Sequence, residues 1–340
     1  MSNILKDKNI LVTGGNGSIG SVIVREILRY QPKAVRALSN DENGLFNLEQ
    51  ELRNFENVRF LVGDIRDKER LHRAVENIDL IFHAAALKHV PLCERNPFEA
   101  VKTNVLGSQN LVEVAIEEEV DKMIILSTDK AVTPFSVMGA TKLLAERLVI
   151  AANYYKGARK TAFSCVRFGN VLNSQGSVFP IFVEQIKKGG PITLTDPNMT
   201  RFVMSISKAV GLVLKAAEMA KGGEIFILKM SALRIGDLAD AMIEELALKY
   251  GYKPENIEVK ITGKRPGERY YEVLMAEEEI KSAYELGGMF MLGPDELEAS
   301  AGTSISTAEK RYKSNNDASL LTRDEIKLLI RETIIEGTSE

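Results

Sequence analysis

Three residues suited to acid–base chemistry stand together at the end of an apolar run. Residues 122–126 are mostly apolar, and Thr128, Asp129 and Lys130 follow them with a hydroxyl, an acid and a potential base. Further along, Lys142 follows Met138 by four residues, which puts both side chains on one face of a helix. A tyrosine at 138 could accept a proton there, because the lysine charge would lower the pKa of its phenol. Methionine cannot, so the pattern indicates proton transfer without a phenolic base.

A glycine-rich turn lies between an apolar strand, residues 9–13, and an amphipathic helix, residues 21–30. Its glycines are spaced G-x-x-G-x-x-G, which permits a tight turn and a close approach of the backbone to a pyrophosphate at the helix N-terminus. In isolation this could be a turn of no special purpose, but the strand and helix around it favour dinucleotide binding. The residues expected at the phosphates are Gly14, Gly17, Ser18, Ile19 and Gly20.

The ends of the next two strands predict which dinucleotide is bound. The second strand, residues 34–38, ends in Ser39 and Asn40, where an acidic residue would bind the ribose of NAD. Uncharged side chains there can accept a 2′-phosphate, so we expect NADP, with NAD as the alternative, although no arginine adjoins them in sequence. Asp64 follows the third strand, residues 58–62, and is expected with Ile65 beside the adenine.

Alternating apolar strands and helices predict an α/β fold with a Rossmann-like doubly wound parallel sheet and a smaller C-terminal substrate-binding domain. We expect an NAD(P)-binding domain at residues 1–175, with returning segments near 205–230, and an interleaved substrate-binding domain at 176–290. Residues 291–340 are predicted to form a flexible connector, centred on 298–316, and a C-terminal helix at 323–335 that docks on the protein.

Composition excludes several classes of function. The 340 residues carry 44 Lys and Arg against 47 Asp and Glu, so a nucleic-acid partner is not expected. No stretch reaches the ~18 apolar residues of a membrane span, and no apolar signal region opens the chain. We therefore expect a cytoplasmic protein with no membrane partner. The two cysteines show no paired spacing, and the three histidines have no ligand cluster beside them, so no metal is predicted.

Together, the linked motifs resemble those of extended short-chain dehydrogenases/reductases. They are the glycine turn, Ala84-Ala-Ala-Leu-Lys-His-Val-Pro91, Ser127-Thr-Asp-Lys130, Met138-x-x-x-Lys142, Arg167-Phe-Gly-Asn-Val171, Asp196-Pro-Asn-Met-Thr-Arg-Phe202 and Lys264-Arg-Pro-Gly-Glu268. More narrowly, the chain is similar to UDP-N-acetylglucosamine 4,6-dehydratases of polysaccharide biosynthesis. Configuration-retaining members carry methionine at the position of Met138, so the retaining type is expected.

The resemblance implies a reaction and a role for each residue. Hydride passes from C4 of the sugar to NAD(P)+, water is eliminated across C5 and C6, and the hydride returns to C6. Asp129 is expected as acid to the 6-hydroxyl and Lys130 as base at C5, with both pKa values shifted toward neutrality. Thr128 would bind the 4-oxygen, and Lys142 would hold the nicotinamide ribose and polarise a water replacing the phenol.

Further positions are carried over from the same resemblance. Those expected at the cofactor are Ala84, Ala85, Ala86, Lys88, Asn104, Lys142 and Val171. Those expected at the UDP-sugar are Lys88, Asn170, Gln175, Gly176, Ser177, Val178, Phe179, Pro180, Arg201, Arg265 and Glu268. The two arginines would bind the diphosphate and Glu268 the ribose, while the alternative for Arg201 is a surface ion pair.

Three other functions stay open on the sequence. A bifunctional dehydratase/C5-epimerase shares the methionine and the Thr-Asp-Lys triplet. A nucleotide-sugar 4-epimerase is less favoured, since it relies on the tyrosine. A non-catalytic NADP-binding regulatory module would explain the missing tyrosine but not the retained acid and lysines. In this fold, helices such as 97–119 and 138–155 often pair between subunits, so we expect at least a homodimer.

Overall fold

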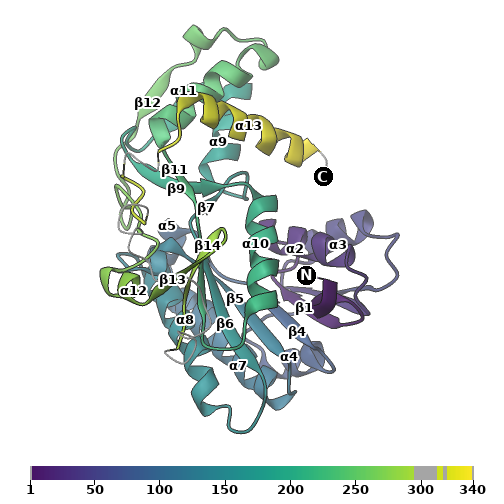
Figure 1. Ribbon diagram of the computed structural model, residues 1–340. Coiled ribbons are helices and arrows are strands. Elements are labelled where there is room, and N and C mark those ends of the chain that lie inside the picture. Colours follow the sequence, from purple (N-terminus) through teal and green to yellow (C-terminus); the bar gives the residue numbers. More distant parts are fainter. Residues whose placement is uncertain (1, 295–311, 317–319, 339–340) are drawn as a thin grey trace.

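The computed structural model describes residues 2–294, 312–316 and 320–338. A large sheet with helices on both faces forms the lower part of Figure 1, and a smaller group of helices and short strands lies at its upper end. The strand order of the large sheet is β13-β14-β10-β6-β5-β4-β1-β2-β3.

Six strands of this sheet form its parallel Rossmann-like half. They are β1 (Asn9–Thr13), β2 (Ala34–Ser39), β3 (Val58–Val62), β4 (Leu80–His83), β5 (Lys122–Thr128) and β6 (Ala162–Phe168). Every neighbouring pair among them is parallel. The order 3-2-1-4-5-6 reverses between β1 and β4, which is where doubly wound sheets bind dinucleotides. The predicted fold class is confirmed.

Three later strands extend the sheet beyond β6. β10 (Ile225–Leu228) pairs with β6 in parallel, while β14 (Met289–Leu292) and β13 (Ala283–Leu286) add an antiparallel hairpin. The sequence analysis did not anticipate this hairpin. Its turn is Gly287-Gly288, with φ of 23° and 91°, and a two-glycine turn between apolar runs is a recognisable hairpin signal.

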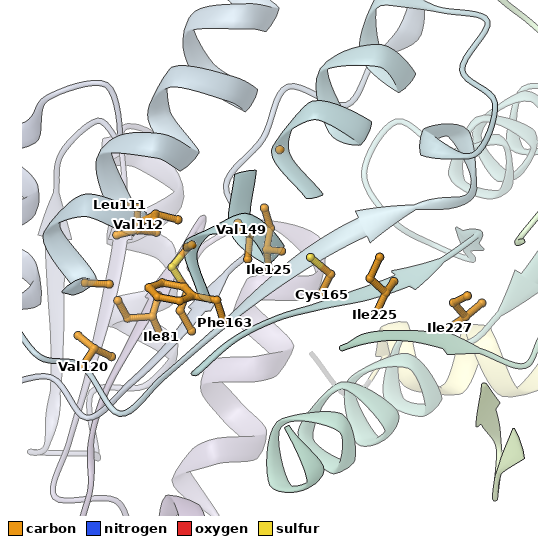
Figure 2. Packing of buried hydrophobic residues seen from close by; sticks show 14 of the residues in the cluster. Ile81, Leu111, Val112, Val120, Ile125, Val149, Phe163, Cys165, Ile225 and Ile227 are labelled. Atoms are coloured by element: carbon orange, nitrogen blue, oxygen red, sulfur yellow. The ribbon is translucent and has the colours of Figure 1, made fainter. Parts of the chain in front are cut away.

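Helices cover both faces because alternate strand residues point in opposite directions. On one face, Ile81 and Ile125 pack against α4 (Lys68–Val75), α7 (Gly107–Glu117) and α8 (Val137–Tyr155), as Figure 2 shows for much of this cluster. On the other, Phe82 and Ile124 pack against α2 (Ser18–Leu28), α3 (Glu42–Glu51) and α10 (Ile206–Met219). Short helices complete this part: α1 (Ser2–Leu5), α5 (Val90–Arg95), α6 (Pro97–Val101), a π-helical turn (Lys102–Leu106) and α12 (Glu277–Lys281).

The smaller part has its own apolar core. It contains β7 (Asn170–Val171), β9 (Thr200–Met204), β11 (Ser231–Arg234), β8 (Ile192–Leu194), β12 (Val259–Ile261), α9 (Val178–Lys187), α11 (Ile235–Leu246) and α13 (Arg323–Thr338). α13 buries Ile326 and Ile330 in this core, and its Arg331 pairs with Glu245 at 2.7 Å. α13 covers the residues for which the sequence predicts a C-terminal helix, and the predicted division of the chain into domains stays a prediction.

One stretch differs from the predicted flexible connector. Most of residues 298–316 lies outside the described residues, but 312–316 is packed against the protein. Tyr312 and Ser314 are buried, and the backbone of Lys313 bridges that of Val273. Ser314 also bonds to Thr200 and to the backbone of Glu272. This segment is thus part of the folded structure.

Candidate functional site

A long cleft of 740 Å³ follows the carboxyl ends of the parallel strands. Its walls come from the turn after β1, the ends of β2 to β6, the start of α8 and residues 174–177. Predicted cofactor positions that line it are Gly14, Gly17, Ser18, Ile19, Gly20, Ser39, Asn40, Asp64, Ile65, Ala84, Ala85, Ala86, Lys88, Lys142 and Val171. A dinucleotide at these positions stays a prediction.

The glycine turn is required by close backbone contacts. Gly14 has a φ of 65°, and a Cβ there would lie 2.8 Å from the backbone nitrogen of Ala85. A Cβ on Gly20 would lie 2.0 Å from the carbonyl oxygen of Gly14. No side chain caps the start of α2, so its first N–H groups face the cleft uncapped, an arrangement suited to phosphate.

An arginine reaches the end of the cleft where Ser39 and Asn40 lie. Arg66 lines the cleft and pairs with Asp64 at 2.6 Å and with Glu99 at 2.8 Å. Its hydrogen bonds keep the pKa of Asp64 low. No arginine stands next to Ser39 in the sequence, because Arg66 reaches this end of the cleft from the loop that follows β3. Its position two residues after Asp64 was the available signal.

The acid–base residues occupy the end of β5 and a short 3-10 turn, Asp129–Ala131. Asp129 is fully buried, and its Oδ1 accepts hydrogen bonds from Thr128 Oγ1 and Lys130 Nζ, both at 2.9 Å. Thr128 and Lys130 line the cleft, whereas Asp129 does not. The role of Asp129 as acid to the 6-hydroxyl stays a prediction, for a side chain that is buried beside two cleft residues.

Lys130 lies among several polar groups. Its Nζ is 3.5 Å from Glu272 Oε1 and 3.3 Å from Asn170 Oδ1, besides its bond to Asp129. Burial lowers its pKa, but the charges of Asp129 and Glu272 outweigh burial, so the pKa is raised overall. The predicted shift of the Lys130 pKa toward neutrality is therefore wrong, because the charges of Asp129 and then Glu272 stabilise the ammonium.

Helix α8 positions Met138 and Lys142 beside this group. Ser136 caps the helix by accepting a hydrogen bond from the Gly139 N–H at 3.1 Å. Met138 is buried yet lines the cleft, as does Lys142 one turn later. Burial lowers the pKa of Lys142 to about 8. Gly139 lets α8 pack closely against the 3-10 turn Asp129–Ala131, since a Cβ at Gly139 would lie 2.3 Å from the Lys130 carbonyl oxygen.

A second pocket of 180 Å³ adjoins the cleft. Arg201, Arg265 and Glu268 line it, and Lys130 and Asn170 line both cavities. Arg201 is buried, with its guanidinium 3.5 Å from Glu268 Oε1, which does not fit a surface ion pair. The pocket also contains Glu272, which the sequence analysis missed because nothing in its spacing pointed to a site.

Some predicted site residues lie elsewhere. Asn104, in the π-helical turn, is buried outside the cleft lining, where its amide holds the backbone of Leu87 and bonds Thr141 Oγ1. Among the predicted substrate residues, Lys88, Gln175, Gly176 and Ser177 line the cleft, but Val178, Phe179 and Pro180 do not. Phe179 instead belongs to the core of the smaller part, because it begins the buried face of α9.

Lys88 lies at the cleft wall with its side chain accessible from the cleft. The surrounding protein lowers its pKa by desolvation.

The histidine nearest the glycine turn, His83, is buried between Thr13 Oγ1 at 2.7 Å and Ser108 Oγ at 3.0 Å. Burial lowers the pKa of His83 to about 3. Within the described ranges, no group of three or more His, Cys, Asp or Glu could hold a metal ion.

None of the helices in the described part of the chain is long and apolar enough to cross a membrane. Location in the cytoplasm stays a prediction.

The sheet order and the glycine turn define a Rossmann-like fold. Residues 10–294 match the family described as polysaccharide biosynthesis protein. The chain is 61% identical over 332 residues to an uncharacterized membrane protein of Methanocaldococcus jannaschii, covering 98% of each. A UDP-glucose 4-epimerase of Rickettsia prowazekii is 38% identical over 334 residues, covering 95% of this chain and 96% of that one.

Two further comparisons bear on the site. A UDP-N-acetylglucosamine 4,6-dehydratase (inverting) of Campylobacter jejuni is 40% identical over 289 residues, covering 84% of this chain and 83% of that one. The X-ray structure of Pen from Bacillus thuringiensis has a TM-score of 0.90 at 44% identity, covering 97% of this chain and 98% of that one. The chain belongs to the polysaccharide biosynthesis protein family, a group of extended short-chain dehydrogenases/reductases that includes nucleotide-sugar dehydratases and epimerases.

Proposed function

We propose that this protein is a UDP-N-acetylglucosamine 4,6-dehydratase of the configuration-retaining type. One observation carries the proposal: Lys130 and Asn170 line both the glycine-turn cleft and the arginine-containing pocket. A dinucleotide in the cleft and a nucleotide sugar in the pocket would therefore meet at the acid–base group. The Campylobacter jejuni relative supports the substrate class, and Met138 supports the retaining outcome.

The cleft residues fit a dinucleotide, since the turn excludes any Cβ at Gly14 and Gly20. When bound, the cofactor would accept hydride from C4 of the sugar and return it to C6. We propose NADP, because Arg66 joins Ser39 and Asn40 at the end of the cleft and would attract a 2′-phosphate. NAD is the alternative, since the Arg66 guanidinium already forms ion pairs with Asp64 and Glu99.

The reaction needs three proton transfers, and each has a group in the site. Lys142, with its pKa near 8, would polarise a water that takes the 4-hydroxyl proton. Lys130 would pass its ammonium proton to Asp129 Oδ1, 2.9 Å away, and the neutral amine would then take the C5 proton. Asp129, once protonated, would pass this proton through the Thr128 hydroxyl, also 2.9 Å away, to the departing 6-hydroxyl. The Thr128 side chain would also bind the 4-oxygen.

Arg201 and Arg265 would bind the diphosphate of the substrate, and Glu268 would bind its ribose. Arg201 is already fixed by bonds to the carbonyl oxygens of Thr200 at 2.8 Å and Tyr270 at 3.3 Å. Little side-chain entropy would then be lost on binding, which favours affinity.

Two other activities have specific support. A bifunctional dehydratase/C5-epimerase would use the same Thr128, Asp129 and Lys130 group. A 4-epimerase is favoured by the full-length Rickettsia prowazekii relative, although Met138 cannot replace the tyrosine on which that reaction relies. The buried, interlocked acid–base group argues against a non-catalytic NADP-binding module.

One experiment separates these functions. The purified protein is incubated with UDP-N-acetylglucosamine in deuterated water, and C4, C5 and C6 of the product are observed by NMR. A retaining dehydratase gives a 4-keto-6-deoxy sugar with deuterium at C5 and unchanged configuration. Inversion at C5 indicates the bifunctional enzyme. Conversion at C4 without loss of the 6-hydroxyl indicates the epimerase and refutes the proposal.

We also propose a homodimer. Helices α5, α6 and α7 each pack against α8. These helices and the π-helical turn between α6 and α7 expose several large apolar side chains. They are Leu92, Phe98, Val101, Leu106, Leu144, Tyr154 and Tyr155. Exposed apolar patches of this kind mark interfaces between proteins.

A further inference from the structure

Glu272 is a buried carboxylate in the substrate pocket, to which no role has been given above. Its side chain is only 3% exposed and lies 3.5 Å from Lys130 Nζ. Its other oxygen, Oε2, has no hydrogen-bond partner within the described part of the chain. An unpaired buried carboxylate oxygen is destabilising, so its presence at a pocket wall points to a function.

The chain fixes the backbone of Glu272 from a distant segment. The Glu272 N–H donates to Ser314 Oγ at 2.8 Å, and the Ser314 N–H donates to the Glu272 carbonyl at 3.0 Å. Ser314 Oγ also donates to the Thr200 carbonyl at 3.2 Å, next to Arg201. Residues 312–316 therefore lock the glutamate at the pocket wall.

We propose that Glu272 is a positioning residue of the reaction, which holds the Lys130 ammonium opposite Asp129 and governs its release of a proton. This inference rests on the proposed function, because it assigns a partner to the lysine that acts at C5. Lys130 Nζ lies between Asp129 Oδ1 at 2.9 Å and Glu272 Oε1 at 3.5 Å, so its direction is set by two carboxylates from different segments. Asn170 Oδ1 supplies the third contact, at 3.3 Å.

The charges that face this pair determine the direction of its effect. Lys130 is influenced by Asp129, Glu272 and Arg201, and Glu272 is influenced in turn by Lys130, Asp129, Arg201 and Arg269. Arg201 Nε is 3.9 Å from Glu272 Oε1. Burial raises the pKa of Glu272, and the nearby Asp129 charge adds to this, while Lys130 and the arginines oppose it. Removing the Glu272 charge leaves Lys130 with one carboxylate and makes proton release easier.

Glu272→Gln is the informative variant, because glutamine keeps the shape of the side chain without its charge. The measurement is single-turnover incorporation of deuterium at C5 of UDP-N-acetylglucosamine, followed across pH. We expect the midpoint at which exchange switches on to fall by about one pH unit or more, the size of shift that a nearby opposite charge produces. KM for the sugar should change little, since Glu272 is assigned no contact with it.

Glu268→Gln is the matched control. Glu268 lines the same pocket and carries the same charge, but contacts Arg201 and not Lys130. We expect this variant to raise KM and leave the pH midpoint of exchange unchanged. If Glu272→Gln does not fold, Glu272→Asp is used instead, since its shorter side chain draws the carboxylate away from Lys130 and should shift the midpoint in the same direction by less.

The outcomes separate the two proposals. Deuterium incorporation by wild type with an unshifted midpoint in the Glu272 variants overturns the inference alone. An equal shift in Glu268→Gln also overturns it, because the effect would then belong to the pocket charge in general. A wild-type protein that incorporates no deuterium at C5 refutes the proposed function itself.

Discussion

The amino group of Lys142 donates a 2.6 Å hydrogen bond to the carbonyl oxygen of Leu126. This bond joins α8 to the end of β5, two residues before Thr128. The lysine is thereby fixed beside the acid–base group, in a buried position that lowers its pKa to about 8. Its neighbour one turn earlier, Met138, supplies apolar surface only.

The different roles of Met138 and Lys142 predict contrasting effects of substituting each one. Met138→Leu should retain the hydride-transfer step within a fewfold, because an apolar side chain of similar volume replaces another. Lys142→Met should slow that step by about 100-fold or more, the usual effect of losing a positioned proton-transfer group. Nicotinamide absorbance after mixing with UDP-N-acetylglucosamine reports the step. Equal losses in both variants would contradict the assigned roles.

Lys130→Ala tests the base. Deuterium incorporation at C5 should fall by at least about 100-fold, because Lys130 is the amine that contacts both Asp129 and Glu272. The transient in nicotinamide absorbance should persist, since oxidation at C4 uses Lys142 instead. Product NMR and stopped-flow absorbance measure the two steps separately. Full C5 exchange in this variant would remove Lys130 as the base.

Gly20→Ala tests the phosphate turn. The new Cβ would lie 2.0 Å from the Gly14 carbonyl, so the turn or α2 must shift. We expect a loss of about 1–3 kcal/mol in the free energy of unfolding and weaker NADP binding by calorimetry. Gly211→Ala is the control, since a Cβ in α10 at that position meets nothing within 4 Å. It should stabilise the protein by about 0.5–1 kcal/mol, and a loss there equal to that of Gly20→Ala would contradict the steric explanation.

The buried His83 should make the folded protein less stable in acid. Its pKa in the folded protein is about 3, well below the ordinary value of 6.5, so only the unfolded chain takes up a proton between these values. The free energy of unfolding should therefore fall as pH drops below 6.5, by up to about 1.4 kcal/mol per pH unit from this residue. Urea unfolding between pH 7 and 4 measures the slope. His83→Asn should flatten it by about one proton, and an unchanged slope would exclude His83 as its source.

Phe98→Glu tests the proposed dimer. Phe98 is 80% exposed on α6, and a charge there should prevent burial of the apolar patch between subunits. Light scattering after size exclusion should show a dimer for wild type and a monomer for the variant. Phe46→Glu, on α3 and 58% exposed, is the control and should stay dimeric. A wild-type monomer would refute the dimer.

The sequence predicted those features that depend on local pattern. The alternation of apolar strands with helices predicted the parallel sheet, and the glycine spacing marked the turn before α2. Thr128 and Lys130 were identified because they directly follow a strand, and the carboxyl ends of parallel strands face one cleft.

Features that depend on segments far apart in the chain could not be predicted from local sequence patterns. Glu272 reaches the site from a loop and Ser314 from the far end of the chain, so no spacing in the sequence reveals them. The pKa of Lys130 is raised by the charge of Asp129 and, from a distant segment, by that of Glu272. Asp129 itself is fully buried. Phe179 was predicted at the substrate because residues just before it line the cleft. In the structure, α9 directs its side chain into the core of the smaller part.

The packing of residues 312–316 against Thr200 and Glu272 has a practical meaning for anyone who shortens this protein. The family match stops at residue 294, which makes that point an inviting place to end a recombinant fragment. Such a fragment would keep the glycine turn together with Thr128, Asp129, Lys130 and Lys142, yet lose the segment that packs behind the pocket. Its failure to turn over sugar would then say nothing about whether the intact enzyme can.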